Sequence, residues 1–350
     1  MFPRLRSYLH RRTLFRLIAL LLPFVLFLLA GEIVLRVRGL TPFSLSPENF
    51  VVEPGGRFYA AHPRLGYTLM PGHFRVTLPD GYSFEATHTE DAHRLTHPVR
   101  AAATDGRTGV WIFGCSFTHG WGLNDAETYP WLLQEKLPRH EVVNFGTEGY
   151  GTIQGLIQFQ EALQRETPEV AIIAYASFHD ERNTFSRQTR KLAVIYNKLG
   201  PTIQPYVRLN QQNLLDYYFT STDEITYTEF PLMRYSSLMS YIEIRYNQLD
   251  ARFNRSHEAS KALIREFANL CSQRNIKLVV AGIVSDPQTS DMLEYCKGLG
   301  ISTLDMSVDL TKKENTNWPH DLHPSKLATE VYASRLASFL SNNVLSMEEN

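Results

Sequence analysis

The stretch Val110-Trp-Ile-Phe-Gly-Cys-Ser-Phe-Thr-His-Gly120 decides the fold that we expect for this chain. An apolar run with strand character ends at Gly114, and Ser116 follows two residues later among small and turn-forming residues. We therefore expect Ser116 at the carboxyl end of a strand. In open α/β sheets, ligands bind in the crevice outside those strand ends, so the Ser116 hydroxyl is a candidate nucleophile. For this stretch alone, an ordinary strand-to-loop turn that contains serine is the alternative.

The rest of the chain alternates between strand and helix patterns. We expect strands at 110–113, 141–145, 170–176, 277–283 and 301–304, and helices near 128–137, 152–165, 257–273, 290–298 and from Pro324 to about 341. The continuous apolar run Val170–Ala176 is typical of a strand that is buried on both faces of a parallel sheet. Repeated strand, turn and helix predict a doubly wound α/β fold.

Two regions interrupt this alternation. Residues 40–105 are rich in proline, glycine and aromatic residues with short alternating pieces, which predicts a spacer and a small β-rich lead-in. Residues 185–255 form an aromatic-rich insertion that either packs its own small core or covers the site and stacks on a sugar. The predicted domains are thus 1–39 as a basic start and anchor, 40–105 as the lead-in, and 106–345 as the α/β domain.

Composition limits the classes of function. With 350 residues, of which 43% are hydrophobic, the chain is expected to be globular. Residues 1–40 hold seven arginines and one glutamate, which leaves 28 basic and 35 acidic residues in the remainder. A mildly acidic body gives no electrostatic reason to expect binding to nucleic acid. Three cysteines, Cys115, Cys271 and Cys296, make neither a disulfide framework nor a metal cluster, and pairing of the last two stays open.

The basic start precedes an apolar segment of transmembrane length. Five arginines lead into the run Leu17–Gly31, which can continue past Glu32 to Leu35 and so reach one bilayer crossing. The arginines are expected to stay in the cytoplasm, with the body exported. A signal peptide cleaved after Ala30 is the alternative, although Leu28 fits its cleavage site poorly.

Several strand ends carry residues that suit acyl transfer. The chemistry needs a nucleophile, a base, a group that orients the base, and donors aimed at an oxyanion. Ser116 could be the nucleophile, His323 the base and Asp321 its orienting partner. The backbone N–H groups of Ser116 and Gly149 could form the oxyanion hole, with His179 as a further donor. No local ligand spacing for a metal is present, so neither cofactor nor metal is expected.

These residues resemble the SGNH, or GDSL-type, hydrolase family over four blocks within residues 112–326. The segment 112–122 is similar to the first block, with Ser116 as its serine, and 143–149 is similar to the second, with Gly149 as its oxyanion glycine. The segment 320–324 is similar to the last block, with His323 as its histidine. The basic anchor and the stretch 64–72 further resemble membrane-anchored bacterial members. The resemblance implies a three-layer α/β/α sandwich with a mainly parallel, flavodoxin-like sheet.

Two blocks depart from the family pattern. Where the third block usually reads G-x-N-D, this chain has Ser177-Phe-His179-Asp180, so that His179 replaces the asparagine donor. Where the last block commonly has D-x-x-H, position 320 is a histidine and the aspartate is Asp321. Asp305, at the end of the preceding expected strand, is the reserve candidate for the aspartate.

The expected function is that of a serine esterase or O-acyltransferase that uses an acyl-enzyme intermediate. Export and the aromatic insertion favour acyl esters of envelope or exported glycans as substrates. The expected location is the bacterial inner membrane, with a single crossing and the catalytic domain on the periplasmic side. A catalytically silent glycan-binding or envelope-assembly domain is the alternative, which the altered third and last blocks favour. A lipid-acting enzyme is a further possibility.

Overall fold

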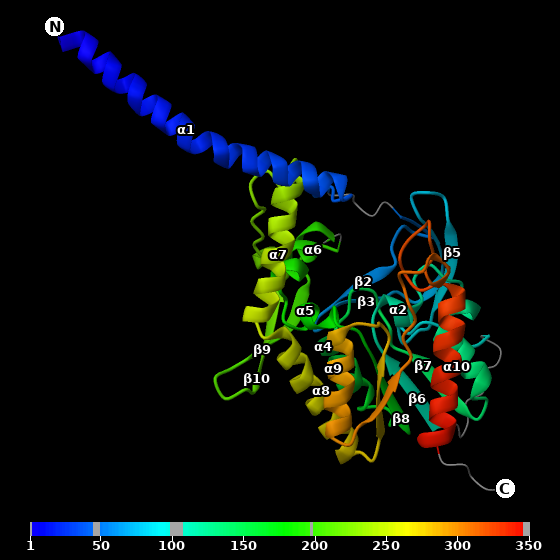
Figure 1. Cartoon of the computed structure of the whole chain (residues 1–350). Coiled ribbons are helices and arrows are strands. Elements are labelled where there is room, and N and C mark those ends of the chain that lie inside the picture. The colour runs from blue at the N-terminus through cyan, green and yellow to red at the C-terminus, as the bar shows by residue number, and fades with distance from the viewer. Residues whose placement is uncertain (1, 45–49, 99–107, 197–198, 346–350) are drawn as a thin grey trace. The chain divides into compact units, whose positions relative to one another are not determined.

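The computed structural model describes residues 2–44, 50–98, 108–196 and 199–345 (Figure 1). The chain divides into two compact units. Unit 1 comprises Met1–Ser46 and Tyr227–Leu249, and unit 2 comprises Pro47–Thr226 and Asp250–Asn350. The predicted boundary between lead-in and α/β domain at residue 105 lies outside the described residues.

A five-stranded parallel sheet forms the centre of unit 2. Its strands are β6 (Thr108–Phe113), β7 (His140–Asn144), β8 (Val170–Tyr175), β11 (Lys277–Gly282) and β12 (Ser302–Asp305). They lie in the order β12-β11-β8-β6-β7, and every pair is parallel. The chain moves from β6 to β7 on one side and then crosses to β8 on the other, so β6 lies at a topological switch point.

Helices cover both faces of this sheet, as the α/β/α expectation requires. One face packs against α4 (Thr152–Ala162), α8 (Ser256–Gln273) and α9 (Pro287–Gly298). The other packs against α3 (Tyr129–Lys136) and α10 (Lys326–Asn343). Alternate residues of β6 point to opposite layers, because Trp111 and Phe113 belong to the first core and Val110 and Ile112 to the second. The expected three-layer fold is confirmed.

Polar caps set the starts of several helices. The Thr128 side chain accepts from Trp131 N at the start of α3, and Asp286 accepts from Thr289 N before α9. Ser325 caps α10 by accepting from Ala328 N, so Pro324 lies before the cap. The expectation that Pro324 occupies the first helical turn is therefore wrong, because Ser325 is the better N-cap residue. All three cysteines are buried and unpaired, which excludes a Cys271–Cys296 disulfide in this structure.

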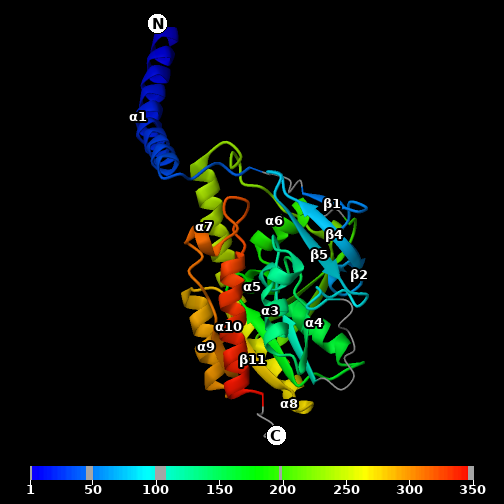
Figure 2. The same cartoon turned by 90° about the vertical axis from the view of Figure 1, so that its right-hand side faces the viewer.

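The lead-in forms small antiparallel sheets. β4 (Gly72–Thr77) pairs with β1 (Val51–Glu53) and β5 (Ser83–His88), and Figure 2 shows these three strands side by side. A second pair joins β2 (Tyr59–His62) to β3 (Gly66–Leu69). Their apolar side chains form a separate core that includes Trp121 from the segment after Ser116. The lead-in thus packs directly against the candidate nucleophile segment.

The aromatic-rich insertion belongs to both units. In unit 2 it contains α6 (Arg187–Tyr196) and an antiparallel hairpin of β9 (Ile203–Leu209) and β10 (Leu215–Ser221). Aromatic rings of the hairpin stack on one another, with Tyr206 and Tyr218 5.1 Å apart and Phe185 stacked on Tyr206. This packing fits the expectation of a small core within the insertion. In the structure, residues 227–249 belong to unit 1 instead.

Unit 1 contains the N-terminal helix α1 (Phe2–Val37) and most of α7 (Ser237–Phe253). The segment Phe15–Val37 of α1 has 23 residues and contains an 18-residue window with a mean hydropathy of 2.6, so it is long and apolar enough to cross a membrane. Its side chains are not buried within the structure. A signal sequence meets the same criteria of length and composition.

Short helical segments complete the fold. They are α2 (Ser116–His119), η2 (Asp125–Glu127), α5 (His179–Asn183), η3 (Thr222–Glu224) and η4 (Lys313–Asn315). Two of them follow strands at the carboxyl edge of the sheet, because α2 comes after β6 and α5 comes after β8. This edge carries the candidate active site.

Candidate active site

Ser116 lies just beyond β6 and is the first residue of α2. It is buried, with 7% of its surface exposed. The tight turn before it requires glycine at position 114, because a Cβ there would collide with the Thr118 side chain. Thr118 is in turn fixed by Tyr129, whose hydroxyl donates to its Oγ1 at 3.0 Å. The nucleophile segment is therefore held by buried contacts on the side of α3.

His323 reaches Ser116 from the loop before α10. Its Nε2 lies 2.9 Å from the Ser116 Oγ, a distance at which the hydroxyl can donate its proton to the ring. The two residues are 207 positions apart in the chain, so the fold alone brings them together. The ring also packs 5.6 Å from Phe117.

Asp321 is the carboxylate beside this histidine. Its Oδ1 accepts from the His323 backbone N–H at 2.8 Å, and its Oδ2 lies 3.5 Å from His323 Nδ1. Oδ2 is buried and has no hydrogen-bond partner among the described residues. The reserve candidate Asp305 instead accepts from the backbone and hydroxyl of Ser307. Between these two carboxylates, the one that faces the His323 ring is Asp321.

His320 occupies the position where the family pattern places its aspartate, and it faces the lead-in. Its Nδ1 lies 2.6 Å from Asp80 Oδ2, and its ring stacks on Tyr82 at 4.1 Å. The hydrogen bond to His320 lowers the pKa of Asp80. The Tyr82 hydroxyl also donates to the Gly122 carbonyl at 2.7 Å. The turn between β4 and β5 thus contacts both the histidine loop and the segment after Ser116.

Gly149 lies in the loop after β7 with a φ of +75°, a conformation that favours glycine. A Cβ at this position would meet the Tyr67 hydroxyl at 2.5 Å. The loop is joined to the serine turn by Thr147, whose N–H donates to the Gly114 carbonyl at 3.2 Å. Within the described part of the chain, neither the Ser116 nor the Gly149 N–H donates a hydrogen bond. Both groups are therefore available as donors.

Glu148, next to Gly149, is the centre of a buried polar network. Its Oε1 lies 2.5 Å from Nδ1 of His119, the last residue of α2. Two lead-in tyrosines hold the same residue: Tyr59 donates to its Oε2 at 2.9 Å and Tyr67 to its carbonyl at 2.5 Å. His88 of β5 completes the network through His119, with 3.0 Å between the two Nε2 atoms. The network links the serine helix, the Gly149 loop and the lead-in.

These contacts fix where the protons of the network lie. The Met70 carbonyl can only accept, so His88 Nδ1, 2.8 Å away, carries a proton. Burial lowers the pKa of His88 to about 2, so its ring is neutral and Nε2 accepts from His119. His119 Nδ1 and Glu148 Oε1 are 2.5 Å apart, which is too close for two atoms that both accept, so one proton lies between them. His119 and Glu148 therefore share a proton in a pair without net charge.

Burial lowers the pKa of His119, and the attraction of Glu148 acts against this effect. Burial raises the pKa of the Glu148 carboxyl, but the attraction of His119 and the hydrogen bonds from His119 and Tyr59 outweigh burial and lower it. A buried pair of this kind is strongly destabilised when one partner is lost, because the other charge stays buried without compensation. The network is consequently a rigid support beneath the Gly149 peptide.

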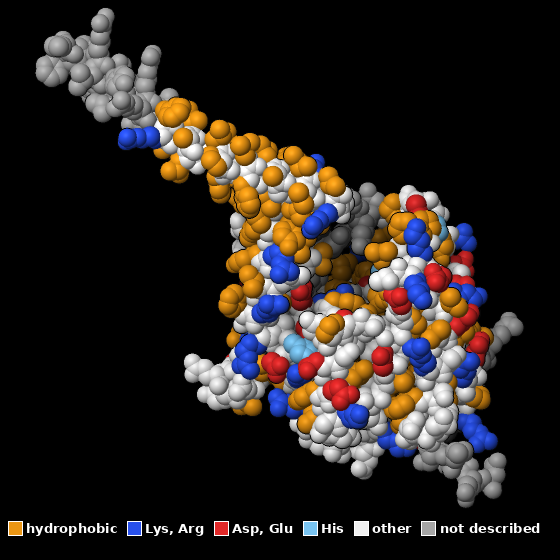
Figure 3. Space-filling model, viewed as in Figure 1, with side chains coloured by type: hydrophobic (Ala, Val, Ile, Leu, Met, Phe, Trp, Pro, Cys, Tyr) orange, Lys and Arg blue, Asp and Glu red, His pale blue; other side chains and the backbone are white. Residues whose placement is uncertain are grey.

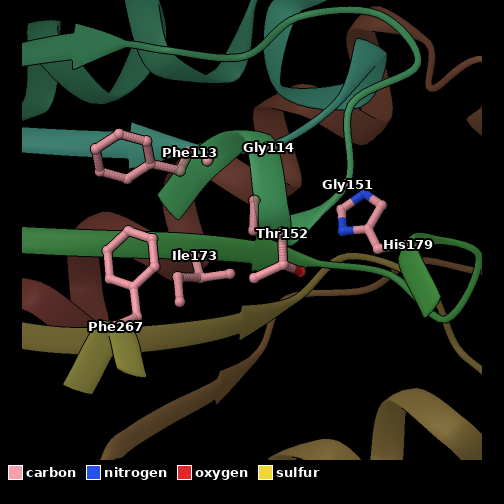
Figure 4. A pocket seen from close by; sticks show the side chains of 9 residues that line it. Phe113, Gly114, Gly151, Thr152, Ile173, His179 and Phe267 are labelled. Atoms are coloured by element: carbon pink, nitrogen blue, oxygen red, sulfur yellow. The ribbon is translucent and has the colours of Figure 1, made fainter. Parts of the chain in front are cut away.

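His179 lies at the start of α5 and is 2% exposed. Figure 4 shows its ring directed toward Gly151 and Thr152, where it lines a cavity of about 10 Å³ that also reaches Gly114. Neither ring nitrogen has a hydrogen-bond partner among the described residues. Burial and the nearby Arg182 hold the pKa of His179 well below its usual value, so the ring is neutral and has one N–H to donate. Its predicted role as an oxyanion donor stays a prediction.

Asp180, beside His179, belongs to a separate ion-pair chain. Its Oδ1 accepts from the Tyr175 hydroxyl at 2.6 Å, and its Oδ2 lies 2.7 Å from His257 Nδ1. His257 also contacts Asp291, with 2.9 Å between Nε2 and Oδ2. This chain connects β8 and α5 to α8 and α9. Asp180 therefore has a structural role, because it joins helices on one face of the sheet to the end of β8.

Sequence reasoning missed the Glu148 network and the contact between Asp80 and His320. A signal for the first was present, because His119 and Glu148 lie inside the two blocks that supplied Ser116 and Gly149, and Tyr67 lies inside the stretch 64–72. Nothing local marks Asp80, which lies in a short polar turn and meets His320 only through the tertiary fold.

Comparisons with known proteins find distant structural similarity only. No family model and no curated protein matches the chain. The chain is similar to the solved structure of a member of the lipolytic protein G-D-S-L family from Veillonella parvula DSM 2008, with 7% identity and a TM-score of 0.40 over 67% of this chain and 99% of that one. It is also similar to the psychrotrophic esterase EstA from Pseudoalteromonas sp., with 13% identity and a TM-score of 0.39 over 67% and 100%.

A third similar structure is a GDSL-like lipase from Bacteroides thetaiotaomicron VPI-5482. The identity is 13% and the TM-score 0.36, over 71% of this chain and 92% of that one. Identities and TM-scores this low establish neither family membership nor activity. The case for function therefore rests on the geometry of the site.

Proposed function

We propose that this chain is a serine-dependent ester hydrolase or acyltransferase of the SGNH type, with Ser116 as nucleophile. The observation that carries the proposal is the 2.9 Å contact between the Ser116 Oγ and His323 Nε2 at the carboxyl edge of the sheet. Asp321 lies on the Nδ1 side of the same ring, as an orienting carboxylate should.

In the proposed reaction, the Ser116 oxygen attacks the ester carbonyl while its proton passes to His323 Nε2. The tetrahedral intermediate collapses when the ester C–O bond breaks and the leaving alcohol takes that proton. Water or another hydroxyl then attacks the acyl-serine, again with His323 as base, and releases the acid or the new ester. Asp321 stabilises the imidazolium and holds the ring orientation.

The donors proposed for the oxyanion are the N–H groups of Ser116 and Gly149. Both are free of other hydrogen bonds to described residues, and the Gly149 loop is joined to the serine turn. His179 is proposed as a third donor, because its ring is neutral and neither ring nitrogen has a partner among the described residues.

The substrate class that we propose is an acyl ester whose acyl part contacts aromatic side chains. Phe117 lies 5.6 Å from both the His323 ring and Phe178, which gives the serine an apolar border. Esters of exported glycans are the proposed natural substrates, and the exposed hairpin residues Tyr217 and Tyr218 are candidate stacking surfaces.

We further propose that α1 anchors the enzyme in the bacterial inner membrane. The apolar segment Phe15–Val37 is long enough to span it, and the arginines before this segment favour a cytoplasmic start and a periplasmic body.

The test is covalent labelling of the full-length chain in mild detergent with a fluorophosphonate probe, followed by peptide mass spectrometry. The serine oxygen displaces fluoride from phosphorus, so an activated serine becomes labelled. We expect label on Ser116 that is lost in Ser116→Ala and reduced at least about a hundredfold in rate in His323→Ala. Heat-unfolded chain serves as the control for nonspecific labelling.

Folded chain that stays unlabelled would favour the second candidate, a silent glycan-binding or envelope-assembly domain. The changed third block, with buried His179 in place of asparagine, is the observation that keeps this candidate open. If label is found, turnover of acetylated oligosaccharides compared with long-chain esters separates the glycan substrate from a lipid substrate.

A further inference from the structure

Helix α7 has its polar and apolar faces reversed for a helix of a water-soluble body. Its buried positions are all polar, namely Ser237, Ser240, Glu243 and Asn247. They recur at three- and four-residue spacing and so form one face. An ordinary surface helix buries its apolar residues and exposes its polar ones. The exposed face of α7 therefore requires an explanation.

The exposed face carries an apolar stripe, which we define as Leu238, Ile242, Tyr246 and Leu249. These residues follow each other at intervals of four, four and three, so they lie in line along the helix. Ile242 is 40% exposed, Tyr246 48% and Leu249 46%, whereas Leu238 is half-buried. Tyr241 flanks the stripe and is 40% exposed. The same line contains one basic side chain, Arg245, between Ile242 and Leu249. An exposed surface that is mainly apolar marks a contact with a partner or a membrane.

The stripe begins at the apolar span of α1. Glu32 of α1 caps the start of α7, because its carboxylate accepts from Ser237 N at 3.0 Å and from Leu238 N at 2.8 Å. It also accepts from the Ser236 hydroxyl at 2.7 Å. Gly31, the residue before Glu32, lies beside Leu238, because a Cβ built at position 31 would be 3.7 Å from the Leu238 side chain.

The position of Glu32 in α1 sets the depth at which α7 would lie in a membrane that α1 spans. Glu32 lies five residues before Val37, the end of the apolar segment, which corresponds to about 8 Å along a helix. Helices that lie in a membrane surface are buried roughly 5–10 Å into the boundary between headgroups and acyl chains. Within unit 1, α7 starts at this contact and runs crosswise to the second half of α1 (Figure 1). This is the direction that a helix lying in the membrane plane should take.

We infer that α7 is an interfacial membrane helix whose apolar stripe lies among the lipids that surround α1. The inference rests on the proposed anchoring by α1 and adds a second, peripheral contact with the same bilayer. Tyrosine is favoured at this depth because its ring is apolar and its hydroxyl reaches water. Arg245 is exposed and donates to Gln248 Oε1 at 2.9 Å, and its guanidinium has further N–H groups for lipid phosphates.

Lipid is favoured over a protein partner by the continuity of the two surfaces. The stripe starts against Gly31 inside the apolar span, and Figure 3 shows apolar side chains along α1 with further apolar and basic side chains over α7. Any partner that covered the stripe near Leu238 would have to enter the bilayer beside α1.

The experiment uses the full-length chain reconstituted in phosphatidylglycerol and phosphatidylethanolamine vesicles. A nitroxide is attached to Tyr246→Cys, and in a matched sample to Gln248→Cys, an exposed polar position of the same helix outside the stripe. The three native cysteines are buried and do not compete for the label. Electron paramagnetic resonance then measures collisions with oxygen, which concentrates in lipid, and with a water-soluble nickel chelate.

We expect the ratio of oxygen to nickel collisions to be at least about threefold higher at position 246 than at 248. Equal, water-like ratios at both positions would overturn the inference. Dipolar broadening at 246, which disappears on dilution with unlabelled chain, would overturn it in favour of a second copy of the chain. Carbonate extraction of the same vesicles tests the anchor separately, because an anchored chain stays in the pellet even if α7 lies in water.

Discussion

At the scale of single residues, the weakest contact of the proposed triad is that of its carboxylate. Asp321 Oδ2 lies 3.5 Å from His323 Nδ1, beyond a good hydrogen bond, while Oδ1 holds the His323 backbone. Closure of this gap when substrate binds would align the ring for catalysis. The charge at this position, and not only its shape, should therefore matter for the rate.

We predict that Asp321→Asn lowers kcat on p-nitrophenyl acetate by about a hundredfold with little change in KM. The amide keeps the size of the side chain but cannot stabilise the imidazolium. Asp305→Asn is the matched control and should stay within about twofold of the unmodified chain, because Asp305 bonds Ser307. A larger fall in kcat in Asp305→Asn than in Asp321→Asn would assign the orienting role to Asp305 instead.

Glu148 acts through its neighbour Gly149, which makes it a candidate positioning residue. We predict that Glu148→Gln lowers the free energy of unfolding by about 2 kcal/mol, since His119 loses its charged partner. Loss of the rigid support should also lower kcat more than it raises KM, because the Gly149 N–H acts on the oxyanion.

The comparison for this prediction is Glu161→Gln on α4. Glu161 pairs with Arg64 at the surface, so its loss should change stability by less than about 0.5 kcal/mol and leave kcat unaltered. Urea unfolding and steady-state kinetics on both variants provide the readouts. A fall in stability with unchanged kcat in Glu148→Gln would reduce its role to folding alone.

Four candidate residues could be found from sequence, because each lies near a recognisable strand end or helix start: Ser116 and Gly149 follow strands, and Asp321 and His323 precede α10. Their partners in the lead-in could not. His320 meets Asp80 across 240 positions, and His88 meets His119 across 31, with no periodic pattern that connects them. Pairing of this kind depends on the tertiary fold, which hydrophobic periodicity does not encode.

At the scale of elements, the turn between β4 and β5 holds the histidine loop. Tyr82 does this in two ways, by stacking on His320 and by donating its hydroxyl to the Gly122 carbonyl. The lead-in therefore contributes to the geometry of the site although the proposed mechanism uses none of its residues.

We predict that Tyr82→Ala lowers kcat about tenfold, because small displacements of a catalytic loop are costly. Tyr82→Phe keeps the stacked ring and should retain most of the rate. Kinetics on the two variants, with circular dichroism to check folding, separate the stack from the hydrogen bond. Equal losses in both variants would assign the effect to the hydroxyl.

Strands and helices of the α/β body were predictable within a few residues, since apolar runs bounded by turns define them. The expected strand 170–176 corresponds to β8 at Val170–Tyr175, and the expected helix 257–273 to α8 at Ser256–Gln273. The aromatic insertion was less informative. Its pattern did not indicate that residues 227–249 belong with the N-terminal helix, because the polar buried face of α7 reverses the usual signal.

At the scale of the whole molecule, unit 2 combines a parallel sheet, its helices and the lead-in around one site, and it holds all four tryptophans. Its stability can therefore be followed by tryptophan fluorescence in the detergent-solubilised chain. The ion-pair chain through Asp180, His257 and Asp291 joins the layer of α8 and α9 to the end of β8. It gives this unit a defined dependence on pH.

Burial alone lowers the pKa of His257, but its hydrogen bonds to Asp180 and Asp291 outweigh burial and raise it above the ordinary value of 6.5. A histidine whose pKa is raised on folding binds its proton more tightly in the folded state. Its contribution to stability is complete below the unfolded pKa and is lost as the pH rises through the folded pKa. His257→Gln should therefore destabilise the body by about 1 kcal/mol at pH 5, a figure kept small because Asp291 is largely exposed.

The difference between the unmodified chain and His257→Gln should shrink steadily as the pH rises from 6 to 9, measured by urea unfolding at each pH. Hydrogen bonds from Lys261 and His257 lower the pKa of Asp291, so this carboxylate stays charged over the whole range. Asp291→Asn removes one of the two partners and should show a smaller difference over the same range. If the cost of His257→Gln grew toward pH 9, the histidine would contribute as a neutral ring, and the ion-pair chain would have to be assigned to packing.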